Sequence, residues 1–240
     1  MPIHIGPSGW NYREWRQGFY QGVPQRRWLP LCTETFTGVE VNGTFYRLPK
    51  PRTLETWRET APAGGFRYAV KGWRMVTHQK KLRDPGEYVP RVREALAPLM
   101  DRVGVVLWQL PAGLHKDMER LDLFARALDA WPDMRHAIEF RHESWFDDTV
   151  ADFLGAHGIA NVISDAADWP CWTRVTTDLV YVRLHGHEET YHSAYGEAGL
   201  EPWAVRIRQW HDEGRTVHVY FDNTDAGAAP DDARRLMRML

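Results

Sequence analysis

The chain has 240 residues, of which 43% are hydrophobic and 12% aromatic, a composition that excludes a mainly disordered protein. Thirty basic residues stand against 32 acidic ones, so the net charge of −2 argues against a protein that binds duplex nucleic acid through overall positive charge. A local basic patch is still compatible with these numbers. This length suits one large domain or two small ones, and α/β barrels often form a single unit of this size.

Cysteine usage and the amino terminus predict a cytoplasmic protein. Cys32 and Cys171 are too far apart for a CxxC motif, and a core of this size needs no disulfide. The first residues contain no basic region followed by an apolar run, and no apolar run approaches the roughly 18 residues of a membrane-spanning helix. We therefore expect no membrane partner, while the oligomeric state stays open.

Short β-like runs alternate with longer helix-like runs along the chain. The eight β-like runs are His4 to Gly6, Val39 to Asn42, Arg67 to Lys71, Val103 to Gln109, His136 to Arg141, Ile159 to Asp165, Leu179 to His185, and Thr216 to Asp222. Such alternation is typical of βα units around a parallel sheet.

Helical patterns occupy the segments between these runs. Met118 to Ala130 repeats apolar residues with helical spacing, and a second helix is predicted over Asp148 to His157. Pro202 and Pro230 are expected in the first turns of two further helices, the first of which ends at Gly214. Since no Ser/Gly linker divides the chain, residues 1–240 are predicted to form one domain, a TIM-barrel-like closed (β/α)8 barrel of the α/β class. An open doubly wound sheet is the alternative fold.

Alternate residues of a barrel strand face the interior and the surrounding helices. Several of the predicted strands have one apolar row and one polar row; in the seventh, Val182 and Leu184 flank Arg183. If the apolar rows meet the helices, the side chains that point inward are Glu40, Asn42, Lys71, Gln109, Glu139, Arg141, Arg183, His185 and Asp222. Most of them lie near the carboxyl ends of the strands, where barrel enzymes carry their active sites.

The formal charges of this inward set cancel, because three carboxylates face three basic groups when histidine is neutral. An uncompensated charge inside a barrel costs several kcal/mol, so these groups are expected to pair. The pairing is either a structural salt-bridge network or a functional site, and we favour a site because apolar side chains would fill a barrel at least as stably. On that interpretation Glu139→Gln or Arg183→Met abolishes ligand binding and leaves stability almost unchanged.

Familiar catalytic motifs fail on inspection. Gly6 to Trp10 lacks the final glycine of the GxSxG nucleophile elbow. His187 and His192 are five residues apart, whereas two zinc ligands on one helical face are four apart. The sequence also contains no Walker A or GxGxxG stretch.

Seven blocks of the sequence together resemble one known family. They are Gly6 to Trp15 (GPSGWNYREW), Glu40 to Pro49 (EVNGTFYRLP), Lys71 with Thr77 and His78, Gln109 to Pro111, Glu139 to Arg141 with Trp145, Arg183 to Gly186, and Tyr220 to Thr224. From about Ile5 onward the chain is similar to the YecE-like family, a bacterial and archaeal domain of unknown function. The resemblance implies a TIM-barrel-like fold and no established reaction. Gly43 stands where that family usually has serine.

The inward basic groups predict an anion site. Those able to surround a phosphate or carboxylate are Lys71, Arg141, Arg183 and His185. Glu139 or Glu40 would then be the general base, kept ionised by the cations around it. The alternative role of either glutamate is to hold an arginine in place.

Aromatic side chains occur in or near the predicted βα loops, where they could stack on a base or a sugar. They are Trp10, Tyr12, Tyr46, Trp73, Trp145 and Tyr195. Each one alone is explained by loop packing, but they share blocks with the charged residues. His78, in a predicted loop, is a second acid/base candidate whose simpler role is packing.

The cofactor is unknown, and a divalent metal is not favoured. The side chains of suitable type are Glu40, Glu139, Asp165, His185 and Asp222. Arg141 and Arg183 would compete for the same carboxylates and repel a divalent ion.

These observations predict catalytic roles for Glu139, Lys71 and His185. The predicted substrate-binding residues are Trp10, Tyr12, Glu40, Asn42, Tyr46, His78, Gln109, Arg141, Trp145, Asp165, Arg183, Asp222 and Asn223. We expect an enzyme, a hydrolase or a lyase, acting by general acid/base catalysis on a small anionic ligand that bears phosphate or carboxylate, a nucleotide or nucleic-acid end included. The alternative is a non-catalytic barrel that binds a nucleotide or single-stranded nucleic acid. The substrate and reaction stay open.

Overall fold

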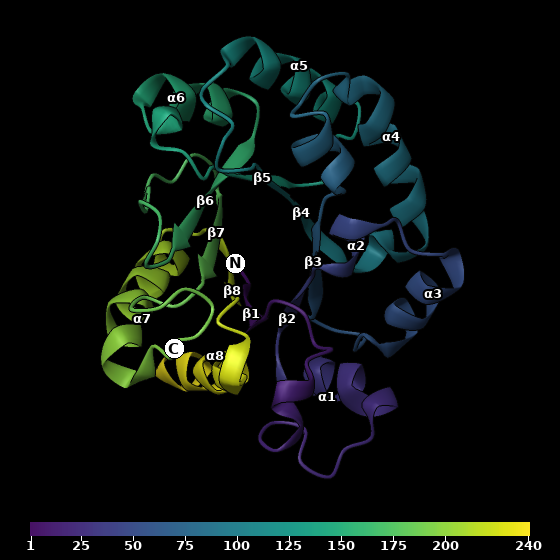
Figure 1. The fold of residues 1–240 in the computed structure, drawn as a ribbon, viewed down its shortest axis with the longest axis vertical. Coiled ribbons are helices and arrows are strands. Elements are labelled where there is room, and N and C mark those ends of the chain that lie inside the picture. The colour runs from purple at the N-terminus through teal and green to yellow at the C-terminus, as the bar shows by residue number, and fades with distance from the viewer.

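Eight parallel strands form the centre of the computed structural model, which describes residues 1–225 and 227–240 (Figure 1). The strands are β1 (Ile3–Pro7), β2 (Gly38–Val41), β3 (Arg67–Lys71), β4 (Val103–Gln109), β5 (His136–Glu139), β6 (Ile159–Asp165), β7 (Leu179–Leu184) and β8 (Thr216–Phe221). Their hydrogen-bonded order is β1-β8-β7-β6-β5-β4-β3-β2. All eight predicted runs are confirmed as strands, with ends that differ by at most two residues.

The two outer strands of this order, β1 and β2, meet and nearly close the sheet into a barrel. Ser8 forms a parallel bridge with Glu40, and the Gly9 amide donates to the Glu40 carbonyl oxygen at 2.7 Å. Just before β2 begins, the Thr37 amide donates to the carbonyl oxygen of Ile5 at 3.2 Å. The TIM-barrel-like prediction is therefore confirmed over the open doubly wound sheet.

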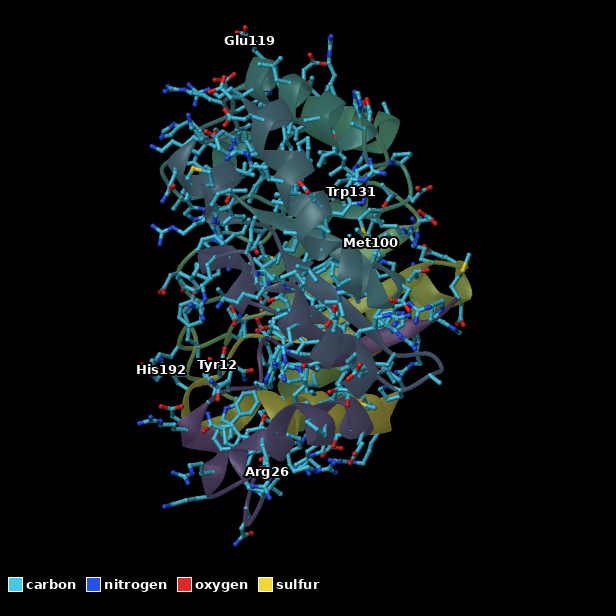
Figure 2. All side chains as sticks on the ribbon, turned by 90° about the vertical axis from the view of Figure 1, so that its right-hand side faces the viewer. Tyr12, Arg26, Met100, Glu119, Trp131 and His192 are labelled. Carbon is cyan, nitrogen blue, oxygen red and sulfur yellow. The ribbon has the colours of Figure 1, made fainter. Side chains whose placement is uncertain are left out.

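Helices form a ring around the strands (Figure 1). They are α1 (Trp28–Thr35), α2 (Gly43–Tyr46), α3 (Pro51–Thr60), α4 (Pro85–Leu96), α5 (Met118–Asp129), α6 (Asp148–Ala156), α7 (Gly196–Asp212) and α8 (Ala228–Met239). Tyr12 and His192 follow β1 and β7 and lie on one side of the molecule in Figure 2, opposite Met100 and Trp131, which precede β4 and β5. Within the described residues, no helix has both the length and the apolar character to cross a membrane.

Side-chain caps mark the starts of α5 and α7. The Asp117 carboxylate accepts from the amide of Arg120 at the start of α5, which confirms the helix predicted there. The expectation that Pro202 lies in a first turn is wrong, because α7 begins six residues earlier, at Gly196. The Asp232 carboxylate on α8 accepts from the amides of Tyr195 and Gly196 at 2.9 and 3.3 Å, so the start of α7 is capped from another helix.

The strands separate two sets of buried side chains, as their alternation predicts. Val182 and Leu184 on β7 belong to the large apolar core that includes the helices, whereas Tyr181 belongs to a separate cluster. That second cluster, on the alternate row of the strands, fills the barrel interior with Ala69, Val105, Leu107, Ala137, Ala160, Val162, Leu179, Tyr181 and Tyr220. The inward row thus begins apolar and becomes charged toward the carboxyl ends of the strands.

Gly6 lies where β1 and β2 approach too closely for a side chain. A Cβ atom at this position would lie 1.9 Å from the carbonyl oxygen of Gly38, a backbone atom that can move only with its strand. We expect Gly6→Ala to lower the free energy of unfolding by about 3 kcal/mol or more. Urea unfolding followed by circular dichroism measures the loss. Gly18→Ala is the control, because nothing lies within 4 Å of a Cβ there; equal losses in both variants would contradict the close approach.

Candidate functional site

Arg183 is fully buried at the barrel mouth, where three carboxylates surround its guanidinium group. Its Nε and Nη2 donate to Glu40 at 3.0 and 2.7 Å, and Nη1 donates to Glu139 at 2.9 Å. Nη2 also donates to Asp222 at 2.8 Å. Because β2, β5, β7 and β8 supply these groups, the contacts join opposite sides of the barrel. All three guanidinium nitrogens are engaged, so Arg183 has little capacity to bind a ligand.

Hydrogen bonds from two hydroxyl groups also hold the Glu40 carboxylate. Tyr181 on β7 donates its hydroxyl to Glu40 at 2.6 Å, and Ser8 donates to the other oxygen. Ser8 in turn accepts from the Asn42 amide at 2.7 Å. The carboxylate is thus fixed by hydroxyl and guanidinium groups together, which matches a positioning role for Glu40.

Glu139 is fully buried and also hydrogen-bonded on both oxygens. It accepts from Arg141 and Arg183, and from the Ser164 hydroxyl at 3.1 Å. Burial alone would raise the pKa of this carboxyl, but the Arg141 and Arg183 charges outweigh burial and hold it well below the ordinary glutamate value. A carboxylate that stable in its ionised form is a weak base at neutral pH.

His185 is buried between an acid and two arginines. Its Nδ1 lies 3.1 Å from Asp222, and its Nε2 lies 3.4 Å from Arg141 and 3.3 Å from Arg183. Burial and then the Arg183 charge lower the pKa of His185 to about 4, so the ring is neutral at physiological pH. These neighbours favour a proton on Nδ1 and an accepting Nε2. Both nitrogens therefore face protein groups.

Lys71 differs from every other charged group of the cluster. Within the part of the chain that the structure describes, its Nζ makes no ion pair or hydrogen bond, and it lies 4.7 Å from the ring centre of Phe45. Burial and the Arg183 charge lower the pKa of Lys71 to about 8, although Asp222 and the two glutamates oppose this. Lys71 therefore exists as both ammonium and free amine near neutral pH.

Arg141 forms the edge of the cluster toward solvent. Its side chain is 8% exposed, and its guanidinium carbon lies 3.7 Å from the centre of the Trp169 ring. The Trp169 indole donates to Ser164 at 3.0 Å and meets the His185 ring edge-on at 5.0 Å. Sequence reasoning missed Trp169, which lies in an irregular segment after β6 where no periodicity indicates a direction.

Three further residues of the cluster were missed as site residues. Tyr181 and Ser164 occupy inward positions of β7 and β6, so strand alternation alone identifies them. Ser8 lies one residue beyond β1, inside the GPSGW block, and only its bridge to Glu40 reveals its place.

Several predicted site residues contact the surrounding loops and helices and not the cluster. Asp165 accepts from the Tyr195 hydroxyl at 2.6 Å, and the Asn223 amide donates to Asp232 at 3.0 Å. Trp145 is fully buried, and its indole donates to a backbone carbonyl oxygen in the loop between β4 and α5 at 2.8 Å. The structure does not bring these three predicted ligand contacts to the mouth.

The remaining predicted residues lie around the rim. Trp10, Tyr12 and Asn42 line a hollow of about 430 Å³ beside the mouth, with Tyr12 on the side of Figure 2 that carries the carboxyl ends of the strands. Tyr46 is 68% exposed, and Gln109 is partly buried at the end of β4.

His78 lies close to several cations. Its Nδ1 is 2.9 Å from the Thr77 hydroxyl, and the ring is partly buried. Burial, followed by the charges of Lys71, Arg74 and Arg141, lowers the pKa of His78 to about 4. The ring is therefore neutral, and the cations around it favour an anionic neighbour.

The side chains of the mouth do not form a metal site. Among residues 1–225 and 227–240, no group of three or more His, Cys, Asp or Glu side chains is arranged to hold a metal ion. Glu40, Glu139 and Asp222 instead surround Arg183, and a divalent cation would have to displace its guanidinium group. The donor set fits an arginine.

The comparison with protein families identifies the chain. The family model described as "Protein of unknown function DUF72" matches residues 4–240. The chain belongs to the DUF72 family. This membership agrees with the resemblance to the YecE-like family found in the sequence blocks, and it assigns no reaction.

Relatives of this DUF72 chain match nearly its whole length. The UPF0759 protein YecE of Escherichia coli strain K12 is 25% identical over 255 residues, which cover 95% of this chain and 89% of YecE. The UPF0759 protein YunF of Bacillus subtilis is 23% identical over 269 residues, covering 99% and 94%. The crystal structure of a DUF72 family protein from Thermotoga maritima has a TM-score of 0.88 at 25% identity and covers 100% of this chain and 99% of that one. The barrel fold is thus shared with this relative.

Removing the guanidinium group of Arg183 is expected to destabilise the fold strongly. Arg183→Met leaves three carboxylates without their shared partner, two of them fully buried, and should lower the free energy of unfolding by about 3–5 kcal/mol. These contacts reverse the expectation, from sequence alone, that this variant keeps its stability. Urea titration measures the change. Arg58→Met, which breaks an exposed pair with Asp101, is the control and should leave the midpoint nearly unchanged; similar midpoints for both variants would contradict the role of Arg183.

The lowered pKa of Lys71 is directly measurable. Only the free amine reacts with acetic anhydride, so labelling of Lys71 should rise with pH and level off soon above pH 8, whereas an ordinary lysine continues to rise beyond pH 10. Trace labelling between pH 6 and 11, read by peptide mass spectrometry, gives the profile. Nα-acetyl-lysine amide labelled in the same buffers is the control. Parallel profiles for Lys71 and this model compound would show that the Lys71 pKa is not lowered.

Proposed function

We propose that this protein is an enzyme that acts on a small substrate bearing phosphate or carboxylate, with Lys71 as the general acid or base at the carboxyl end of the barrel. One observation carries the proposal. Lys71 has no partner of its own within the described residues, while the groups around it are already paired. A proton-transfer group needs such freedom and a pKa near the working pH.

The other two predicted catalytic residues are better suited to positioning. Glu139 is held ionised by two arginines, and His185 is held neutral between Asp222 and the same arginines. Neither can exchange a proton without breaking contacts that hold Arg183 and Arg141. Their function, on this proposal, is to fix the cations beside Lys71.

The substrate class follows from the groups left available at the rim. Arg141 has an Nη1 without a hydrogen-bond partner among the described residues, and its side chain reaches solvent. With Lys71 it lies in the group of cations that lowers the pKa of His78. Two cations and a neutral imidazole suit a phosphate or carboxylate oxygen. Hydrolase and lyase chemistry both require the proton transfer that Lys71 offers.

Metabolite depletion tests the proposal. Purified protein is incubated with a mixture of phosphorylated and carboxylated metabolites, and each compound is followed by mass spectrometry. We expect depletion of an anionic compound, at least 10²-fold slower with Lys71→Met and unchanged with Lys81→Met. Depletion that Lys71→Met does not slow would overturn the catalytic role. An anionic compound that binds and is never converted would favour the non-catalytic barrel.

A further inference from the structure

Two hollows beside the mouth adjoin each other, because Gly43, Arg47 and Trp57 line both. Their volumes are about 430 and 380 Å³. We name them together the Trp57 groove, defined by Trp10, Tyr12, Asn42, Arg47, Lys50 and Trp57. The groove runs from the end of β1 across α2 to α3, and it is large enough for a ligand of several rings.

The charge of the Trp57 groove has one sign. Its lining includes Arg47 and Lys50, both exposed and without an ion-pair partner among the described residues, and it includes no acidic side chain. A hollow of about 520 Å³ between α3 and the segment before β4 is instead lined by Glu55, Glu59 and Asp101 together with an arginine. The Trp57 groove therefore favours an anion.

Two tryptophans supply an apolar wall that turns through a right angle. The rings of Trp10 and Trp57 meet edge to face, with centroids 5.3 Å apart and an angle of 89°. Both side chains are only partly buried, so part of each indole can contact a ligand. Indole faces stack well on planar heteroaromatic rings.

Asn42 connects the Trp57 groove to the charged cluster. Its amide nitrogen donates to Ser8, which donates to Glu40. Its Oδ1 is buried and has no hydrogen-bond partner within the described part of the chain. A buried acceptor without a partner is rare in folded proteins, and here it can receive an N–H or O–H from a ligand.

We propose that the Trp57 groove binds a nucleotide. The base packs against Trp10 and Trp57, the phosphate pairs with Arg47 and Lys50, and Asn42 accepts a hydrogen bond from the base or sugar. An aromatic wall, unpaired cations and a free acceptor are together the features that recognise a nucleobase carrying a phosphate. That this nucleotide is also the substrate of Lys71 rests on the proposed function.

Calorimetric titration of the full chain tests the groove. The probes are AMP, GMP, CMP and UMP, with adenosine and ribose 5-phosphate as the two halves of a nucleotide. We expect at least one mononucleotide to bind, at least tenfold more tightly than either half. Arg47→Met should weaken the mononucleotide and not adenosine, and Trp57→Leu should weaken both. Leu123→Ala, exposed on α5 and outside the groove, is the control and should change neither.

Each other outcome overturns a stated part. Ribose 5-phosphate binding as tightly as the mononucleotides, or no effect of Arg47→Met and Trp57→Leu, would remove the groove as a nucleotide site, and circular dichroism checks that both variants fold. A single-stranded oligonucleotide that binds far more tightly than every mononucleotide would show that the ligand of the groove is a nucleic acid and not a free nucleotide. The unchanged protein separates the two proposals. Nucleotide affinity without turnover of any anionic compound overturns the catalytic role alone, and turnover of an anionic compound without nucleotide affinity overturns the groove alone.

Discussion

The ion cluster around Arg183 is the constraint on which the barrel mouth depends. The Arg183 guanidinium group binds carboxylates from β2, β5 and the end of β8. None of these three strands lies next to another of the three in the sheet order. Leaving a buried charge without its partner costs more free energy than the ion pair contributes. Loss of any one of the four groups is therefore destabilising. Several other polar side chains at the mouth contact these four groups. Tyr181, Ser8 and Ser164 complete the carboxylates, and Arg141 and His185 close the cluster toward solvent.

Stability alone does not explain such a cluster. The lower part of the same interior is filled by apolar residues such as Leu107 and Val162, which need no desolvation of charge, so the fold has a simpler way to fill a barrel. The ion cluster holds its side chains in place through hydrogen bonds, while Lys71 makes no ion pair or hydrogen bond within the described residues. On the proposed function, fixed cations around one free amine suit proton transfer.

Local rules account for most of the fold and for the inner part of the site. The alternation of each strand is a property of neighbouring residues, so the sequence predicts that Glu40, Lys71, Glu139 and Arg183 point inward. Charge neutrality predicts that they pair, which holds for the two glutamates and Arg183 but is wrong for Lys71 among the described residues. The same alternation explains why some predicted site residues do not reach the mouth. Ser164 faces inward on β6, so Asp165 faces the other way, toward Tyr195. Asn223 likewise follows Asp222 and contacts α8. Trp169 lies in an irregular segment whose path depends on tertiary packing, which a single sequence does not specify.

The protonation of Lys71 and the binding of an anion are coupled through the charge of this cluster. Three carboxylates and two guanidinium groups sum to one negative charge, so the neutral amine leaves the mouth negative and the ammonium makes it neutral. An incoming phosphate or carboxylate therefore favours the ammonium form and raises the Lys71 pKa, because its negative charge would otherwise add to the negative charge of the partly buried mouth. Release of the anion reverses the change. On the proposed function, the free protein thus holds the Lys71 pKa at about 8, and the charge of an anionic substrate favours protonation of the amine.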